Sequence, residues 1–384
     1  MGVNFDNTEI AFSAKSETDL KRARLLFKSF DFPILLSWGP LLAKIAVFIG
    51  LKGLIKNTIF KQFCGGENIN ECKNTIESLD QSGIGTILDY SVEGEDDEGT
   101  FEKTKKQILG TIAASKNNDK IPFAVFKVTG IIPSKILEKK SVAHDLSKKD
   151  NEVWEKGKQR FFEICNTAYE YKVRLFIDAE ESWLQGAIDN LADEAMAKYN
   201  QDSCLIYNTL QLYRHDRLAK LKLDFKNTTH YLGYKLVRGA YMEKERARAN
   251  EFGYEDPIQV DKKSTDEDYN KAIEFCIENA NRISICIGTH NEQSSALSVE
   301  LMKKNKMDSS DKRVCFSQLL GMSDHISFNL SNSGYNVAKY VPFGPVLSVI
   351  PYLTRRAQEN SGVAGQMSRE LTLIEREIKR RKTN

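Results

Sequence analysis

The chain has 384 residues, 41% of them hydrophobic and 28% charged, which suits one large domain with an accessory segment. Its 55 Lys and Arg residues nearly balance its 53 Asp and Glu residues, and the formal net charge is +2. Nucleic-acid-binding proteins carry a strong basic excess on one face, so we expect no nucleic-acid partner.

Cysteine and histidine usage argues against disulfides and metal sites. The cysteines are dispersed without a CxxC pair, and we expect them to be reduced core residues of a cytosol-like compartment. No histidine pair has the HExxH spacing of a zinc site, so we expect no bound metal.

Residues 1–80 are predicted to form a basic helical arm. Within the arm, Phe32–Leu51 is apolar and nearly long enough to cross a membrane. Pro33, Pro40 and Lys44 interrupt this stretch, which favours a buried or interfacial amphipathic helix over a true span. Association of the arm with a membrane surface is therefore a hypothesis.

Short apolar runs follow the arm and alternate with longer amphipathic stretches. Runs with nearly continuous hydrophobicity are typical of parallel strands that are buried on both faces. The predicted strands are Thr86–Ser91, Phe123–Gly130, Arg174–Glu180, Ser203–Gln211, Tyr231–Gly239, Arg282–His290, Arg313–Gly321 and Val337–Gly344. Predicted helices between them include Glu102–Ser115, Glu152–Tyr171, Trp183–Tyr199 and Gln293–Lys304.

This alternation predicts an α/β fold, either a (β/α)8 barrel or a doubly wound sheet. No GxGxxG motif follows the first strand, which weakens the doubly wound, dinucleotide-binding alternative. We expect the barrel to occupy residues 81–365 and a basic C-terminal helix to occupy residues 366–384.

Polar side chains gather where the predicted strands end. The carboxyl ends of barrel strands meet at one mouth, where the chemistry of such folds is found. Lys127, Asp178, Lys235 and Arg238 end the second, third and fifth strands, and Gly239 can let backbone approach a ligand closely. These cations predict an anionic ligand, such as a carboxylate or a phosphate-bearing cofactor.

A predicted helix after the last strand carries an unusual face. Tyr352, Arg355, Arg356 and Glu359 have the i, i+3, i+4, i+7 spacing of one helix face, which usually carries apolar residues. Adjacent arginines can each grip a carboxylate in a fork. The helix therefore extends the cationic character of the predicted mouth.

Each of these residues also has a plainer explanation. Arg355 and Glu359 can form an exposed salt bridge, Asp178 can cap the next helix, and His290 can be a structural histidine. Lys127 is harder to explain in this way, because a lysine within a buried strand costs free energy unless it reaches a partner. The joint placement at the strand ends carries the functional interpretation.

Five longer motifs resemble one known family, the proline dehydrogenases. They are KLVRGAYMEKERARA (235–249), IDAEESW (177–183), THNE (289–292), QLLGM (318–322) and YVPFGPVLSVIPYLTRRAQEN (340–360). The segments GYEDPI (253–258) and 123–130 resemble the family in the same order, so the resemblance covers about residues 84–365. Agreement over so many motifs is far more specific than one short pattern.

The resemblance implies a distorted (β/α)8 barrel that holds FAD at its mouth. The enzyme would oxidise L-proline to Δ1-pyrroline-5-carboxylate by hydride transfer from C5 to flavin N5. Electrons would then pass to a membrane quinone, as the first step of proline catabolism. The monofunctional chain would leave the next step to a separate pyrroline-5-carboxylate dehydrogenase.

The resemblance also implies roles for individual residues. Asp178 and Lys235 match catalytic positions, and Glu93 matches a gating carboxylate that can pair with the first arginine. The substrate-binding positions are Lys127, Leu319, Tyr340, Tyr352, Arg355, Arg356 and Glu359. The cofactor-binding positions are Ala179, Asn208, Lys235, Arg238, Gly239, Ala240, Thr289 and His290.

Two departures and two alternatives accompany the resemblance. Some bacterial relatives have Gln in place of Asn208, and Arg in place of Lys235, where lysine loses the planar fork of arginine. Hydroxyproline dehydrogenase is one alternative, but the bulk of Tyr340 favours proline. A catalytically dead flavin barrel that acts as a binding module is the other, although all carried-over positions hold competent residue types.

The quinone acceptor implies at least transient contact with a membrane. We expect a cytoplasmic protein that is peripheral at the inner membrane of a bacterium, or a mitochondrial one if the source is eukaryotic. The polar and acidic N-terminus does not resemble an Arg-rich presequence, which favours the bacterial setting.

Overall fold

The structure is a computed structural model that describes residues 2–29, 53, 56–92, 96–142, 144–352 and 366–383, without the side chains of 366–368. The chain divides into two compact units. The terminal unit comprises residues 1–93 and 317–384, and the central unit comprises residues 94–316.

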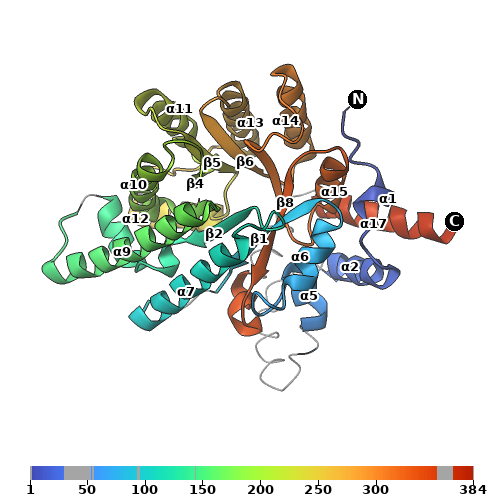
Figure 1. The fold of residues 1–384 in the computed structure, drawn as a ribbon, viewed down its shortest axis with the longest axis horizontal. Helices are drawn as coiled ribbons and strands as arrows, with labels where there is room; N and C mark the ends of the chain where they lie inside the picture. Colours follow the sequence, from blue (N-terminus) through green and yellow to red (C-terminus); the bar gives the residue numbers. More distant parts are fainter. Residues whose placement is uncertain are drawn as a thin grey trace. The chain divides into compact units, whose positions relative to one another are not determined.

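Eight strands form one closed barrel whose strand order follows the sequence (Figure 1). They are β1 (Ile84–Tyr90), β2 (Phe123–Lys127), β3 (Arg174–Asp178), β4 (Ile206–Gln211), β5 (Leu232–Val237), β6 (Ile283–Gly288), β7 (Val314–Leu319) and β8 (Val337–Phe343). Nearly every strand residue is buried, as expected for parallel strands covered on both faces. The closed barrel confirms the predicted (β/α)8 fold and excludes the doubly wound sheet.

Helices cover the strands of the central unit (Figure 1). They are α7 (Glu98–Ser115), α8 (Ser134–Ser141), α9 (Lys148–Tyr171), α10 (Ser182–Tyr199), α11 (Arg217–Asn227), α12 (Met242–Phe252), α13 (Lys262–Glu278) and α14 (Glu292–Lys304). The predicted helices are confirmed but begin one to four residues earlier than expected, and side-chain caps define the starts of α7, α9 and α14. Asp97 accepts from the Thr100 amide at 3.0 Å, and Asn291 accepts from the Ser294 amide at 2.9 Å.

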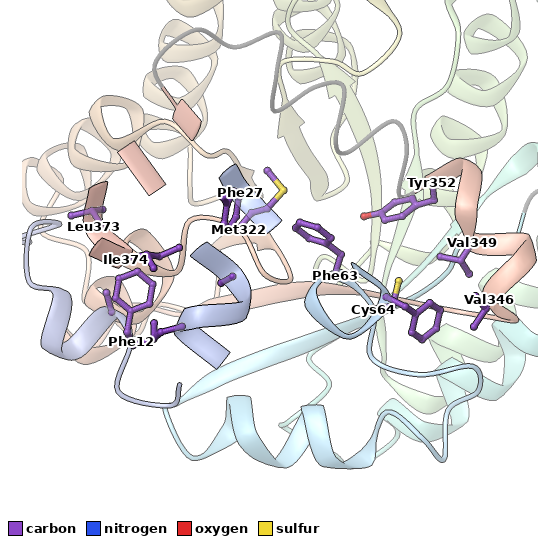
Figure 2. Packing of buried hydrophobic residues seen from close by; sticks show 14 residues of the cluster. Phe12, Phe27, Phe63, Cys64, Met322, Val346, Val349, Tyr352, Leu373 and Ile374 are labelled. Carbon is purple, nitrogen blue, oxygen red and sulfur yellow. The ribbon is translucent and has the colours of Figure 1, made fainter. Parts of the chain in front are cut away.

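The terminal unit brings the two ends of the chain together. Its further elements are α1 (Thr8–Ala11), α2 (Glu17–Ser29), η1 (Lys56–Phe60), α5 (Lys61–Phe63), α6 (Lys73–Asp80), α15 (Asp324–Asn332) and α17 (Gln366–Thr383). Figure 2 shows their shared apolar cluster, in which Phe12, Phe27 and Phe63 from the N-terminal part lie with Leu373 and Ile374 of α17. Burial of this surface is the main favourable term that holds the two ends in one unit.

The predicted domain boundaries at residues 80/81 and 365/366 stay predictions, as does a membrane role for the arm. The apolar stretch Phe32–Leu51 lies outside the described residues. Among the residues that the structure describes, no helix combines the length and apolarity needed to cross a bilayer. All seven cysteines are buried free thiols, which confirms their expected core positions, and the expected compartment stays a prediction.

Candidate active site

The strands of the central unit place an aromatic layer below a polar layer. The rings of Phe123 and Phe176 stack with centroids 4.3 Å apart, and Tyr207 meets both edge-on. Side chains that are two residues apart on a strand share a face. Lys127 and Asp178 therefore lie on the same face as these rings, nearer the carboxyl ends of β2 and β3, where they are direct neighbours in register.

Lys235 and Asp178 form a buried ion pair in this polar layer. The Lys235 amine donates a hydrogen bond to Oδ1 of Asp178 and lies 5.6 Å from the centroid of the Phe176 ring. Lys235 is only 5% exposed, so its charge requires the carboxylate as compensation. Asp178 is not the cap of α10, because the residue at that position is Glu181.

Glu180 joins the end of β3 to the turn after β2. Its carboxylate accepts from both the amide, at 3.0 Å, and the hydroxyl of Thr129 in η2 (Val128–Gly130), which directly follows Lys127. Glu180 is 4% exposed, and this burial raises its pKa to about 7 although the Thr129 hydrogen bonds and the charge of Lys127 oppose the shift. A carboxyl group that titrates near neutral pH thus lies close to Lys127.

Arg238 is fixed by partners on three sides at the end of β5. Its guanidinium donates to Asp266 at 2.7 Å, to the Thr289 hydroxyl at 2.8 Å and to the Ser294 hydroxyl at 3.0 Å. It also lies 4.3 Å from the centroid of the Tyr269 ring. Burial opposes ionisation of Asp266, but hydrogen bonds from Lys262 and Arg238 lower its pKa, so the Arg238 pair is a charged one.

Gly239 holds a backbone conformation that other residues rarely adopt. Its φ is +143°, and an added Cβ would lie 2.5 Å from the ring of Tyr213. The next amide, that of Ala240, donates to Oε1 of Gln211 at 3.3 Å. The chain after β5 therefore packs closely against the chain after β4, and only glycine fits at this point.

Asn208 faces the helical layer instead of the polar layer. It is fully buried, and its side-chain amide donates to Asp189 of α10 at 2.9 Å while its carbonyl oxygen accepts from the Thr209 amide at 2.8 Å. Arg217 donates to the other oxygen of Asp189 at 2.6 Å. This arrangement makes Asn208 a structural tether of α10, and its predicted contact with a cofactor stays a prediction.

The remaining cofactor candidates of the central unit lie at the ends of β3 and β6. Ala179 is buried directly after β3. The Thr289 hydroxyl accepts from Arg238 and, at 3.1 Å, from the amide of Asn291, the residue that caps α14. His290, between Thr289 and Asn291 in the sequence, is half-buried. Thr289 and Arg238 are thus brought together, as expected from their positions at the carboxyl ends of two predicted strands.

The terminal unit places Leu319 and Tyr340 on neighbouring backbone segments. Leu319 ends β7, and the next amide, that of Leu320, donates to the Tyr340 carbonyl at 2.8 Å. Tyr340 is 8% exposed, and Leu319 packs at the margin of the apolar cluster. Tyr352, in the helical residues 346–352, is buried in that cluster with Phe63 and Val349 (Figure 2).

Four predicted site residues lie outside the residues that the structure describes. They are Glu93, Arg355, Arg356 and Glu359. The predicted cationic helix face is therefore described only at its first member, Tyr352, and the roles of the other four stay predictions.

Two polar residues of the central unit were absent from the predicted site. Gln211 shares a strand face with Thr209, and its amide donates to the Glu180 carbonyl at 2.7 Å. Period-two alternation along β4, counted from Tyr207, would have selected Thr209 and Gln211 over Asn208. Glu180 ends the third predicted strand but was not selected, because its carboxylate is bonded to a threonine that is distant in the sequence.

Comparisons with known proteins agree with this geometry. A family model described as proline dehydrogenase matches residues 72–369. The chain is 34% identical over 389 residues to proline dehydrogenase 1, mitochondrial, of Dictyostelium discoideum, covering 89% of this chain and 68% of that protein. It is 30% identical over 415 residues to hydroxyproline dehydrogenase of Xenopus laevis, covering 97% and 89% of the two chains.

Solved structures support the fold. Proline utilization A (PutA) from Bdellovibrio bacteriovorus, inactivated by N-propargylglycine, matches with a TM-score of 0.72 at 18% identity. The match covers 93% of this chain and only 38% of the PutA chain. This likeness supports the barrel fold.

Proposed function

Since the chain belongs to the proline dehydrogenase family, we propose that it oxidises L-proline to Δ1-pyrroline-5-carboxylate with FAD as cofactor. The family match over residues 72–369, which include all eight strands, is the observation that carries the proposal. The polar layer formed by Lys127, Asp178 and Lys235 gives it a chemical basis.

The residues at the mouth of the central unit fit a flavin nucleotide. Arg238 offers a fixed cation, and Gly239 lets the backbone after β5 pack closely against the Tyr213 ring, which fixes the course of the chain at this mouth. Lys235 would be a second cation beside the cofactor. Ala179, Ala240, Thr289 and His290 complete the proposed contacts. When bound, the flavin would supply the hydride-accepting chemistry that no amino-acid side chain provides.

The chain's own residues would bind and orient the substrate. Lys127, Arg355 and Arg356 would hold the proline carboxylate, and Glu359 would orient the arginines. Tyr340, Tyr352 and Leu319 would flank the ring and exclude water. Fixing a small cyclic amino acid at both its carboxylate and its ring lowers the entropic cost of reaching a reactive geometry.

The two catalytic candidates would control charge near the reacting carbon. Asp178 holds the Lys235 ammonium in place, so the pair keeps a cation in the buried polar layer. The cationic surroundings would favour the deprotonated amine of proline, whose free lone pair assists loss of hydride from C5. We therefore expect kcat/KM to rise with pH through one ionisation.

The electron acceptor would be a membrane quinone, and a separate pyrroline-5-carboxylate dehydrogenase would use the product. The basic arm before residue 80 and the proposed gate Glu93 would serve access to the membrane and to the site. The relatives named above include one mitochondrial enzyme, so the expected bacterial setting stays a prediction.

Hydroxyproline oxidation is the second candidate, because hydroxyproline dehydrogenase of Xenopus laevis is a relative over nearly the whole chain. The phenol of Tyr340 argues against it, since a ring hydroxyl needs space that this side chain would fill.

A steady-state assay tests the proposal directly. Purified protein is given L-proline and a quinone analogue, and the cyclic imine product is trapped with o-aminobenzaldehyde. Formation of the trapped imine supports the proposal, whereas its absence in flavin-loaded protein contradicts it. The same assay with trans-4-hydroxyproline separates the two candidates.

A further inference from the structure

The turn between β7 and α15 holds an unusual backbone. Gly321 and Ser323 have φ values of 75° and 51°, in the left-handed region. A non-glycine residue such as Ser323 adopts this region at a cost, so the surrounding structure must hold it there. The turn follows Leu319 directly, and it is fixed by polar groups from three other segments of the terminal unit.

Lys339 of β8 is the first of these groups. It is 1% exposed, and its amine donates to the Met322 carbonyl at 2.5 Å and to the Leu319 carbonyl at 3.3 Å. The same nitrogen lies 2.9 Å from Oδ1 of Asp324, the first residue of α15. An ammonium group has three donors, and these three partners account for all of them.

Glu370 of α17 and Gln62 of α5 complete the set. The buried Glu370 carboxylate accepts from the Ser323 amide. The Gln62 amide donates to the Gly321 carbonyl at 3.0 Å, and an added Cβ on Gly321 would lie 2.1 Å from the Gln62 carbonyl oxygen. Both ends of the chain are therefore bonded to the same turn.

We propose that Lys339, Asp324 and Glu370 form a positioning network that fixes the spacing between Leu319 and Tyr340. Lys339 directly precedes Tyr340 and bonds the Leu319 carbonyl, while the Leu320 amide donates to the Tyr340 carbonyl. The network thus acts on both residues through their backbone. This inference rests on the proposed function, in which Leu319 and Tyr340 flank the proline ring.

The charge of the network indicates a positioning role beyond packing. A well-packed apolar side chain could fill the space of Lys339 without the cost of burying an ion pair. An apolar side chain could not, however, direct three bonds at two carbonyls and a carboxylate. Contacts with the non-reacting part of the proline ring are equally strong in the bound substrate and in the transition state, and loss of such contacts raises KM with little change in kcat. The network should therefore affect KM more than kcat.

The first test removes the Lys339–Asp324 ion pair as a unit. In the Lys339→Met/Asp324→Asn double variant neither charge of the pair is left without the other, and Lys15, which lies 3.5 Å from Oδ2 of Asp324, is exposed enough to be solvated instead. Glu370 keeps the Ser323 amide as its donor, so the protein should still fold. We expect KM for L-proline to rise about tenfold or more while kcat changes less than about threefold and bound flavin is retained. An unchanged KM in this folded variant overturns the inference.

Arg282→Met is the matched control. Arg282 precedes β6, at the end of that strand opposite the polar layer, and donates to the carbonyls of Thr228, at 2.8 Å, and Phe225. The substitution likewise removes a cation that bonds carbonyls, and it should leave KM within about twofold of the parent value. A KM increase equal to that of the double variant would mean that only general loss of stability is measured.

Amide hydrogen exchange tests the network without any assay of activity. Glu370→Ala removes the acceptor of the Ser323 amide, so exchange at residues 320–324 should become about tenfold faster or more. Glu370→Gln keeps an acceptor oxygen and should restore slow exchange. Equal exchange in both variants and the parent overturns the inference. A chain that turns over no proline, yet shows the exchange pattern, would refute the proposed function alone.

Discussion

The amine of Lys235 on β5 donates a hydrogen bond to the carboxylate of Asp178 on β3, above the face of Phe176. The strand between them, β4, contributes Thr209, which pairs in register with Lys235. The ion pair thus spans three neighbouring strands of the polar layer. Its buried position makes both partners sensitive to substitution.

Lys235→Met should lower kcat/KM at least about a hundredfold, because it removes the ammonium group that donates to the Asp178 carboxylate in the polar layer. Lys235→Arg keeps the cation and should lose less than about tenfold. Steady-state kinetics on flavin-loaded protein compares the two. Equal losses would mean that the cation itself is not required.

Gly239→Ala should destabilise the protein by about 2–4 kcal/mol and reduce flavin retention. The new methyl group would meet the Tyr213 ring at 2.5 Å in a conformation that L-residues rarely adopt. Gly253→Ala is the control, because Gly253 also has a positive φ of 68° but no atom within 4 Å of the added Cβ. The control should cost about 1 kcal/mol. Urea unfolding measures the loss of stability in both variants. Equal losses would contradict the close contact between residue 239 and the Tyr213 ring.

The free energy of unfolding of the Glu180→Gln variant should increase relative to that of the parent protein as pH rises. Burial raises the pKa of Glu180 to about 7, so the folded state binds its proton more tightly than the unfolded state, whose carboxyl titrates near 4.5. The stability that this proton contributes is present below pH 4.5 and is lost as pH rises through 7. The neutral glutamine does not titrate. Between pH 5 and pH 8 the free energy of unfolding of the parent should fall by up to about 3 kcal/mol relative to that of the variant. Parallel pH profiles of the two proteins would contradict the raised pKa of Glu180.

Tyr340→Ser should raise kcat/KM for trans-4-hydroxyproline relative to L-proline, by about tenfold or more. The smaller side chain leaves space for a ring hydroxyl beside Leu319. Both substrates are measured on the same variant, so a general loss of activity cancels in the ratio. An unchanged ratio would remove Tyr340 as the residue that selects between the substrates.

Strand and helix positions were predictable because buried parallel strands and amphipathic helices carry strong local patterns. The end of β2 was predicted three residues too late, because the apolar run continues through Val128 into η2. Asn208 was assigned to the mouth although alternation along β4, counted from Tyr207, directs it outward. Sequence alone could not supply its partner, because Asp189 belongs to α10 and the contact depends on how that helix packs on the strand.

The site was predictable only in part, for the same reason. Arg238 and Thr289 were both selected, and they share a hydrogen bond of 2.8 Å. Nothing in the sequence around Lys339 indicated a function, because its partners Met322 and Asp324 come within reach only through the fold of the turn before α15. Glu370 lies further still along the chain, and its bond to the Ser323 amide appears only once α17 packs in the terminal unit.

An anaerobic absorption spectrum, recorded before and after addition of L-proline, tests the proposed function most directly. Purified protein loaded with FAD should show the oxidised flavin bands, and L-proline should bleach them without any external acceptor. Bands that persist with L-proline but bleach with trans-4-hydroxyproline would show that the protein oxidises hydroxyproline, the second candidate function. Protein that binds no FAD, or whose flavin neither substrate reduces, would contradict the proposed function.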